Sequence, residues 1–81
     1  MPYVYILKCR DNTYYTGYTV DIERRREEHQ QGLASKYTRG RTPVELVHVE
    51  KLPTKSEAMQ REWQIKKLSR AQKQGLAEGR E

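Results

Sequence analysis

Two short runs of β-branched and aromatic residues open the chain, at 3–9 and at 13–18. Such residues are typical of strands, and the Arg-Asp-Asn at 10–12 between them has the chemistry of a turn. The pattern therefore predicts an antiparallel hairpin. Gly17 is unusual inside a strand and indicates that another group approaches the backbone closely there.

A strongly polar helix is expected next. Asp21 is a suitable N-cap for a helix over 22–31, and Gly32 is suited to end it. Ile22 is the only strong hydrophobe of this helix, so its pattern gives it little apolar surface with which to dock. Residues 33–43 are predicted to form a loop rich in polar and basic groups.

The remaining residues predict one more strand and two helices. Residues 44–49 are expected to form a strand, which Pro53 ends. Alternation along it places Val44, Leu46 and His48 on one face, and Val47 and Val49 on the other. Capping-box patterns open helices over about 54–68 and 69–77. The expected order is β-β-α-β-α-α, an α+β fold with a three-stranded antiparallel sheet flanked by helices.

Size, charge and cysteine content narrow the classes of function. With 81 residues the chain is expected to form one domain, whose folded core covers about 3–77. A net charge of +5 favours a polyanionic partner, most commonly nucleic acid. The single Cys9 excludes an intramolecular disulfide, and with two histidines it matches no zinc spacing. We see no signal peptide and no membrane-spanning run, so a cytoplasmic location is expected.

Three polar side chains lie where helical periodicity brings them near apolar residues. Arg25 and His29 share a face with Ile22, so they point toward the sheet if Ile22 does. The alternative is a solvated helix whose arginines extend into water. Glu62 lies beside the apolar stripe of the helix at 54–68, where a carboxylate is costly unless it is paired or bound to a metal. The alternative for Glu62 is a boundary residue paired with a nearby arginine.

Tyrosines and a basic loop complete the candidates. Five of the six tyrosines lie in the predicted hairpin, and in a chain without phenylalanine some of them are expected to serve as core aromatics. The hairpin cannot bury all five, so some must present their hydroxyl groups. Between 35 and 41, basic groups surround an aromatic ring, which suits phosphate contact and base stacking. The candidate nucleic-acid-binding residues are Lys36, Tyr37, Arg39 and Arg41.

Two tripeptides in the hairpin resemble the signature of the GIY-YIG nuclease domain. Tyr3-Val4-Tyr5 is similar to the first tripeptide, and Tyr15-Thr16-Gly17 is similar to the second. The resemblance covers residues 3 to 68 and is closest to the small stand-alone bacterial members. It therefore describes nearly the whole chain as a single GIY-YIG-like domain over 1–81.

Three further residues fit the same resemblance. Arg25 follows Tyr15 by ten residues, in a segment similar to the family's helix with its essential arginine. His29 lies where several members have a histidine, and Glu62 resembles the family's metal-binding glutamate. By this resemblance the catalytic residues are Tyr5, Tyr15, Arg25 and His29, and Glu62 is the metal ligand.

The resemblance implies a metal-dependent endonuclease that hydrolyses phosphodiester bonds, in DNA rather than RNA, with structure-specific cleavage in repair or recombination. Glu62 would hold Mg²⁺ (or Mn²⁺), and Tyr5 would act as general base if nearby cations favour its phenolate. Two alternatives stay open. The chain could be a non-catalytic nucleic-acid-binding module of the same fold, or a nuclease subunit that cuts only when a protein partner delivers the substrate.

A nuclease site of this kind requires a particular hairpin register. Paired residues in an antiparallel hairpin have a constant sum of residue numbers and point to the same face. A two-residue turn gives a sum of 23 and places Tyr5 and Tyr15 on opposite faces. A three-residue turn at 10–12 gives 22, pairs Tyr5 with Gly17 and makes Tyr15 its diagonal neighbour. We predict the even sum, with Arg25, His29 and Glu62 flanking that face.

Overall fold

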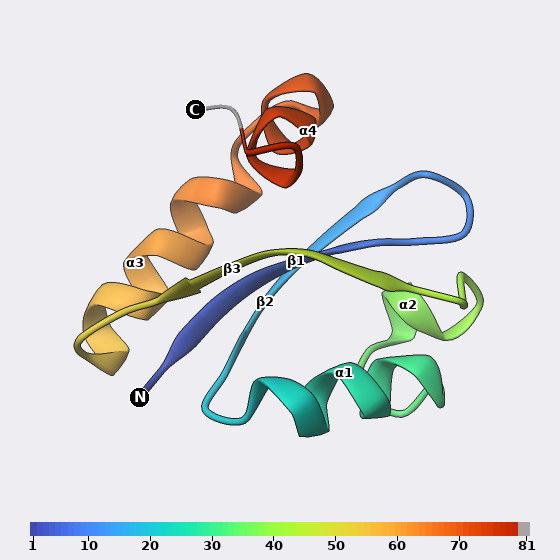
Figure 1. Cartoon of the computed structure of the whole chain (residues 1–81), viewed down its shortest axis with the longest axis horizontal. Coiled ribbons are helices and arrows are strands. Elements are labelled where there is room, and N and C mark those ends of the chain that lie inside the picture. Colours follow the sequence, from blue (N-terminus) through green and yellow to red (C-terminus); the bar gives the residue numbers. More distant parts are fainter. Residues whose placement is uncertain (80–81) are drawn as a thin grey trace.

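A three-stranded antiparallel sheet with helices on both sides forms the molecule (Figure 1). The computed structural model describes residues 1–79. The elements are β1 Tyr3–Lys8, β2 Tyr14–Thr19, α1 Ile22–Gln30, α2 Lys36–Arg39, β3 Glu45–Lys51, α3 Lys55–Lys66 and α4 Arg70–Ala77. The strand order is β2-β1-β3, so the first strand lies in the centre of the sheet. The predicted α+β fold and element order are confirmed, with the short helix α2 as an addition.

The hairpin has the predicted even register. Tyr3 pairs with Thr19 and Tyr5 pairs with Gly17, so paired residues sum to 22. The backbone N–H of Cys9 donates to the carbonyl of Thr13 at 2.8 Å, which closes a three-residue turn at 10–12. Asn12 in this turn has a φ of +67°, a conformation that asparagine tolerates better than most residues. Tyr5 and Tyr15 therefore lie on the same face of the sheet.

Each face of β1 carries its own hydrophobic cluster. Val4 and Ile6 pack against α3 and α4, through a set of buried residues that comprises Ala58, Ile65 and Leu76. Tyr5 and Leu7 point the other way, toward α1, with Cys9, Val44 and the half-buried Ile22. Figure 1 shows α1 and α3 on opposite sides of the sheet. Because β1 is covered on both faces, all four of its residues from 4 to 7 are buried.

The predicted faces of β3 are wrong because the strand contains a bulge. Leu46 pairs with Leu7 and His48 pairs with Ile6, so one residue between them, Val47, is extra. A bulge of this kind shifts the alternation by one residue. His48 therefore lies opposite Ile6 on the α3 side, away from Leu46, and Val47 joins the α3-side cluster while Val49 pairs with Tyr5.

The polar helix α1 is held in place largely by hydrogen bonds. The Asp21 side chain accepts from the backbone N–H of Arg24 at 3.1 Å, and Gly32 has a φ of +77° just beyond the helix. The side chain of Gln30 makes two hydrogen bonds with the backbone of Val44, at 2.6 and 3.0 Å. His29 is the buried residue within the helix, so its docking rests on a polar group.

The predicted loop at 33–43 contains the four-residue helix α2. The Ser35 side chain caps it by accepting from the backbone N–H of Tyr37 at 3.1 Å. One helical turn is too short for periodicity to appear in the sequence. This turn buries Thr38 completely and brings it against α1.

Candidate active site

Tyr5 is the centre of the site because its ring crosses the neighbouring strand at a glycine. It extends from the central strand β1 over Gly17 of the edge strand β2. A Cβ atom at Gly17 would lie 2.5 Å from Cζ of Tyr5 and closer still to the hydroxyl. The close approach expected at Gly17 is thus the Tyr5 side chain, whose hydroxyl is placed next to strand β2. The Tyr15 ring lies beside it, with ring centroids 6.4 Å apart.

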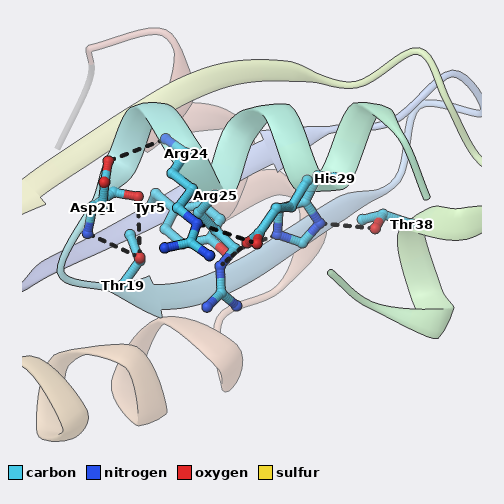
Figure 2. Close-up of polar contacts among 8 residues, drawn as sticks. Tyr5, Thr19, Asp21, Arg24, Arg25, His29 and Thr38 are labelled. Carbon is cyan, nitrogen blue, oxygen red and sulfur yellow. Dashed lines mark hydrogen bonds and ion pairs between the residues drawn. The ribbon is translucent and has the colours of Figure 1, made fainter. Parts of the chain in front are cut away.

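His29 links this hydroxyl to Thr38 of α2 through two consecutive hydrogen bonds (Figure 2). Its Nε2 atom lies 2.7 Å from the Tyr5 hydroxyl, and its Nδ1 atom lies 2.8 Å from Oγ1 of Thr38. The Thr38 hydroxyl donates to the carbonyl of Ser35 at 3.4 Å, so its oxygen is left to accept from Nδ1–H. The neutral imidazole then carries its proton on Nδ1, and Nε2 accepts from the O–H of Tyr5.

Burial and charge keep both partners of this bond neutral. Burial lowers the pKa of His29 to about 4, and the positive charge of Arg25 adds to that effect while Glu28 opposes it. Burial also raises the pKa of Tyr5 well above 10, and the neighbouring Tyr15 adds to the rise. Arg25 lowers the pKa of Tyr5, but less than burial raises it. At neutral pH Tyr5 is therefore a hydrogen-bond donor, and a resting phenolate is disfavoured.

Arg25 places a half-exposed guanidinium group next to the Tyr5 hydroxyl. Its Nε atom pairs with Glu28 at 3.1 Å, and its side chain is 39% exposed. It lines a shallow pocket of about 250 Å³ at the start of α1, together with Thr19, Val20, Asp21, Arg24 and Glu28. Figure 2 shows Tyr5, Arg25 and His29 together between α1 and the sheet. A cation in this position can meet an anionic ligand from solvent.

Glu62 acts on the same tyrosine through its charge, from a helix on the other side of the sheet from α1 (Figure 1). It lies on α3, which packs against β1 and β2, and its side chain is only 15% exposed. Its negative charge contributes to the raised pKa of Tyr5, so the two groups are within electrostatic range. The sequence alternative for Glu62 was an ion pair with a nearby arginine. In the structure its carboxylate pairs with a lysine instead, Lys66, at 3.3 Å.

The donor set around Glu62 suits a loosely held magnesium ion. Among residues 1–79, no group of three or more His, Cys, Asp or Glu side chains could hold a metal ion. Mg²⁺ commonly binds through one or two carboxylates, with water and substrate phosphate as the other ligands. One half-buried carboxylate within electrostatic range of Tyr5 fits that requirement, but does not form a metal cage.

The basic loop lies at the edge of the same site. The ring of Tyr37 lies beside that of Tyr15, with centroids 5.8 Å apart. The guanidinium carbon of Arg41 lies 4.1 Å from the centroid of the Tyr37 ring. Arg41 also pairs with Asp11 at 2.9 Å and donates to the Tyr37 carbonyl at 2.6 Å, so it ties α2 to the hairpin turn. Lys36 and Arg39, two further basic members of the loop, are exposed.

Comparison with known proteins decides the family. The family model described as the GIY-YIG catalytic domain matches residues 1–75. The chain belongs to the GIY-YIG family. GIY-YIG domains are in general nuclease domains that depend on a divalent metal, so a nucleic acid is the implied substrate.

Close relatives of this GIY-YIG domain occur in archaea and bacteria. The UPF0213 protein VNG_2274C of Halobacterium salinarum is 60% identical over 76 residues, which is 94% of this chain and 99% of that protein. The UPF0213 protein OB0043 of Oceanobacillus iheyensis is 53% identical and covers 98% of this chain and 92% of its own. The solution NMR structure of the UPF0213 protein BH0048 from Bacillus halodurans has 49% identity and a TM-score of 0.61, with 96% of this chain and 84% of that chain covered.

Sequence reasoning about this GIY-YIG domain missed one residue of the site. Thr38 is fully buried and holds the imidazole of His29, but threonine in a basic loop gives no signal of its own. The pattern that the sequence shows in this loop is formed by its neighbours Lys36, Tyr37 and Arg39, basic groups around an aromatic ring. The signal that could have found it is the spacing of Ser35 and Thr38, which suits a capped turn. No helix within residues 1–79 has the length and apolar character needed to cross a bilayer.

Proposed function

We propose that this GIY-YIG domain is a metal-dependent endonuclease that hydrolyses phosphodiester bonds in DNA. The observation that supports it best is the hydrogen-bonded chain from Tyr5 through His29 to Thr38, beside the guanidinium of Arg25. Cleavage of a phosphodiester requires an activated water, a cation on the phosphate and a path for the proton. These side chains offer a candidate for each requirement.

Tyr5 serves as a proton relay in this proposal. Its raised pKa argues against a stored phenolate, which the general-base role considered from the sequence would need. Instead, the Tyr5 oxygen takes a proton from the attacking water as its own proton passes to Nε2 of His29. The water becomes hydroxide, Tyr5 stays neutral, and His29 becomes a cation that Thr38 steadies at Nδ1.

Arg25 stabilises negative charge on the scissile phosphate. Its side chain borders the pocket at the start of α1 and its charge already acts on Tyr5. A guanidinium can donate two parallel hydrogen bonds to phosphate oxygens, which become more negative in the transition state. Tyr15, whose ring lies 5.0 Å from that of His29 by centroid distance, would orient the phosphate or the water.

Glu62 is the proposed metal ligand, and Lys66 would have to yield its ion pair when a metal enters. Lys66 is 55% exposed, so its release into water costs little. Mg²⁺ or Mn²⁺ held there would neutralise charge on the scissile phosphate and on the leaving oxygen. Lys36, Tyr37 and Arg39 would contact the nucleic acid beyond the cleaved bond.

A second candidate function is favoured by the burial of Tyr5. Its residue is only 1% exposed, so water reaches its hydroxyl poorly in this conformation. A nuclease that cuts only after a partner or a substrate opens the site would show this geometry.

We further propose that residues 1–81 act as one catalytic domain, in the cytoplasm, in repair or recombination. A binding module without catalysis is the remaining alternative.

The deciding experiment incubates the purified protein with labelled branched, nicked, single-stranded and blunt duplex DNA, and with matched RNA. Each substrate is tested with Mg²⁺, with Mn²⁺ and with EDTA. We expect metal-dependent cleavage of at least one DNA substrate, and its loss in Arg25→Lys, because an ammonium cannot replace the guanidinium fork. Tight binding without cleavage of any substrate would favour the binding module.

A further inference from the structure

An exposed tryptophan lies on the outer face of α3. Trp63 is 61% exposed, and Met59, one helical turn before it, is 46% exposed. Neither residue belongs to the hydrophobic clusters of the sheet. Because Met59 and Trp63 are neighbours on the helix, they form one contiguous apolar patch, and such patches rimmed by polar residues mark interaction sites.

The surroundings of the indole leave one side of it open. The Nζ atom of Lys67 lies 3.5 Å from the Trp63 ring centroid. Met59, Trp63 and Lys67 follow one another at intervals of four residues, so they form a stripe with the indole in the middle. A shallow hollow of about 570 Å³ lies on the Met59 side of the stripe, bordered by Lys55, Ser56, Met59, Gln60 and Trp63.

Charge decides what kind of partner fits this surface. Residues 55–67 contain four basic and two acidic side chains. Arg61 pairs with Glu50 of β3 and Lys66 pairs with Glu62, so Lys55 and Lys67 are the remaining basic groups of this segment, against Glu57. Lysine is depleted at the centres of protein–protein interfaces. An aromatic ring among basic side chains is instead the arrangement on which proteins stack the bases of unpaired strands. The positive charges of Lys55 and Lys67 are complementary to a phosphate backbone.

We propose that the α3 stripe, formed by Lys55, Met59, Trp63 and Lys67, binds an unpaired nucleotide of a nucleic-acid strand, with its base stacked on Trp63. The inference rests on the proposed nuclease function and narrows its substrate. Glu62 precedes Trp63 and points about 100° away around the helix. A strand that passes from Glu62 onto the stripe must have left its duplex, so the substrate carries an unpaired segment beside the cleaved bond.

The test uses the fact that Trp63 is the only tryptophan of the chain. Oligo(dT), oligo(U) and a blunt DNA duplex, each carrying a fluorescent label, are titrated into the protein at low salt without metal. Label anisotropy measures binding, and unlabelled titrations measure quenching of Trp63. We expect both single strands to quench the indole and the duplex not to quench it. Whichever of oligo(dT) and oligo(U) binds more tightly shows whether DNA or RNA is preferred.

Substitutions separate stacking from general attraction. Trp63→Ala is expected to weaken single-strand binding about 5- to 100-fold, and Trp63→Tyr to retain most of it, because a ring is kept. Leu33→Ala is the matched control, since Leu33 is 72% exposed in a loop and its loss should leave binding unchanged.

Single strands that bind without quenching Trp63, or that bind Trp63→Ala as tightly as the original protein, would overturn the inference. So would the absence of any binding to oligo(dT) and oligo(U) at low salt, which would leave the stripe to a protein partner. The titrations contain no metal and measure no cleavage. A failure of the proposed nuclease activity would therefore appear in the cleavage experiment alone, and the two results can be told apart.

Discussion

Gly17→Ala is the sharpest single test of how this site is built. The added Cβ would lie 2.5 Å from Cζ of Tyr5 and 3.0 Å from Cε2 of Tyr15. Favourable carbon–carbon contacts are at about 3.5–4.0 Å, so the overlap with Tyr5 is about 1 Å. The Tyr5 ring cannot simply move, because it is 1% exposed and its hydroxyl is bonded to His29. The methyl group must therefore displace the ring or the strand.

The expected cost can be estimated from two opposing effects. Overpacking in a well-packed site destabilises by about 1–3 kcal/mol. Replacing glycine within a strand returns about 0.5–1 kcal/mol, because less backbone entropy is lost on folding. We expect a net loss of up to about 2.5 kcal/mol in the free energy of unfolding. For a domain of this size, each kcal/mol lowers Tm by about 4–8 °C.

Urea unfolding followed by circular dichroism measures that loss, and the cleavage assay measures its effect on function. Gly40→Ala is the matched control, because no atom lies within 4 Å of the Cβ it would add. Combining Gly17→Ala with Tyr5→Phe removes the most crowded atom, so the pair should cost less than the sum of the two single losses. If Gly17→Ala is as stable and as active as the original protein, the placement of Tyr5 over Gly17 is refuted.

Three further predictions concern the chemistry of the site. Thr38→Val should lower kcat about 10- to 100-fold with little change in KM, because His29 loses the acceptor that fixes its tautomer. Thr38→Ser keeps a hydroxyl and should restore kcat. Normal kinetics in the valine variant would exclude this positioning role. Glu62→Gln should abolish metal-dependent cleavage and leave urea unfolding unchanged, and retained cleavage would remove Glu62 as the metal ligand. The folded-state pKa of His29, about 4, is below the unfolded value, so its stabilising effect is present above pH 6.5 and is lost as pH falls toward 4. His29→Gln should flatten the stability-versus-pH curve in that window, by at most about 3 kcal/mol, and an unchanged slope would show that His29 does not titrate there.

The sequence predicted the parts of the fold that depend on local pattern and on pairing arithmetic. The hairpin register followed from the requirement that Tyr5 and Tyr15 share a face, and the pairing of Tyr5 with Gly17 confirms it. The stop of α1 followed from Gly32, whose φ of +77° suits glycine. These features are decided by a few residues that are close along the chain.

The parts that the sequence could not give depend on contacts between distant segments. The bulge at Val47 arises where β3 adjusts to β1, and strict alternation along 44–49 carries no trace of it. Thr38 was missed because its importance comes from the imidazole of His29, nine residues away. Helical periodicity placed Glu62 beside an apolar face, but it could not tell on which side of the sheet that helix would pack.

The charges around His29 suggest how substrate binding could couple to the proton relay. In the free protein, burial and the neighbouring Arg25 keep the pKa of His29 low, so the imidazole is a poor proton acceptor. A phosphate bound to Arg25 would offset that positive charge. Because the charge of Arg25 is one of the causes of the low pKa of His29, neutralising that charge should raise the pKa. Nε2 of His29 would then be a better acceptor for the Tyr5 proton. The proposed relay would then work better with a phosphate in place, although burial, the larger cause of the low pKa, would persist. On the proposed function, a buried and neutral Tyr5 and His29 are in this way compatible with hydrolysis of a bound strand.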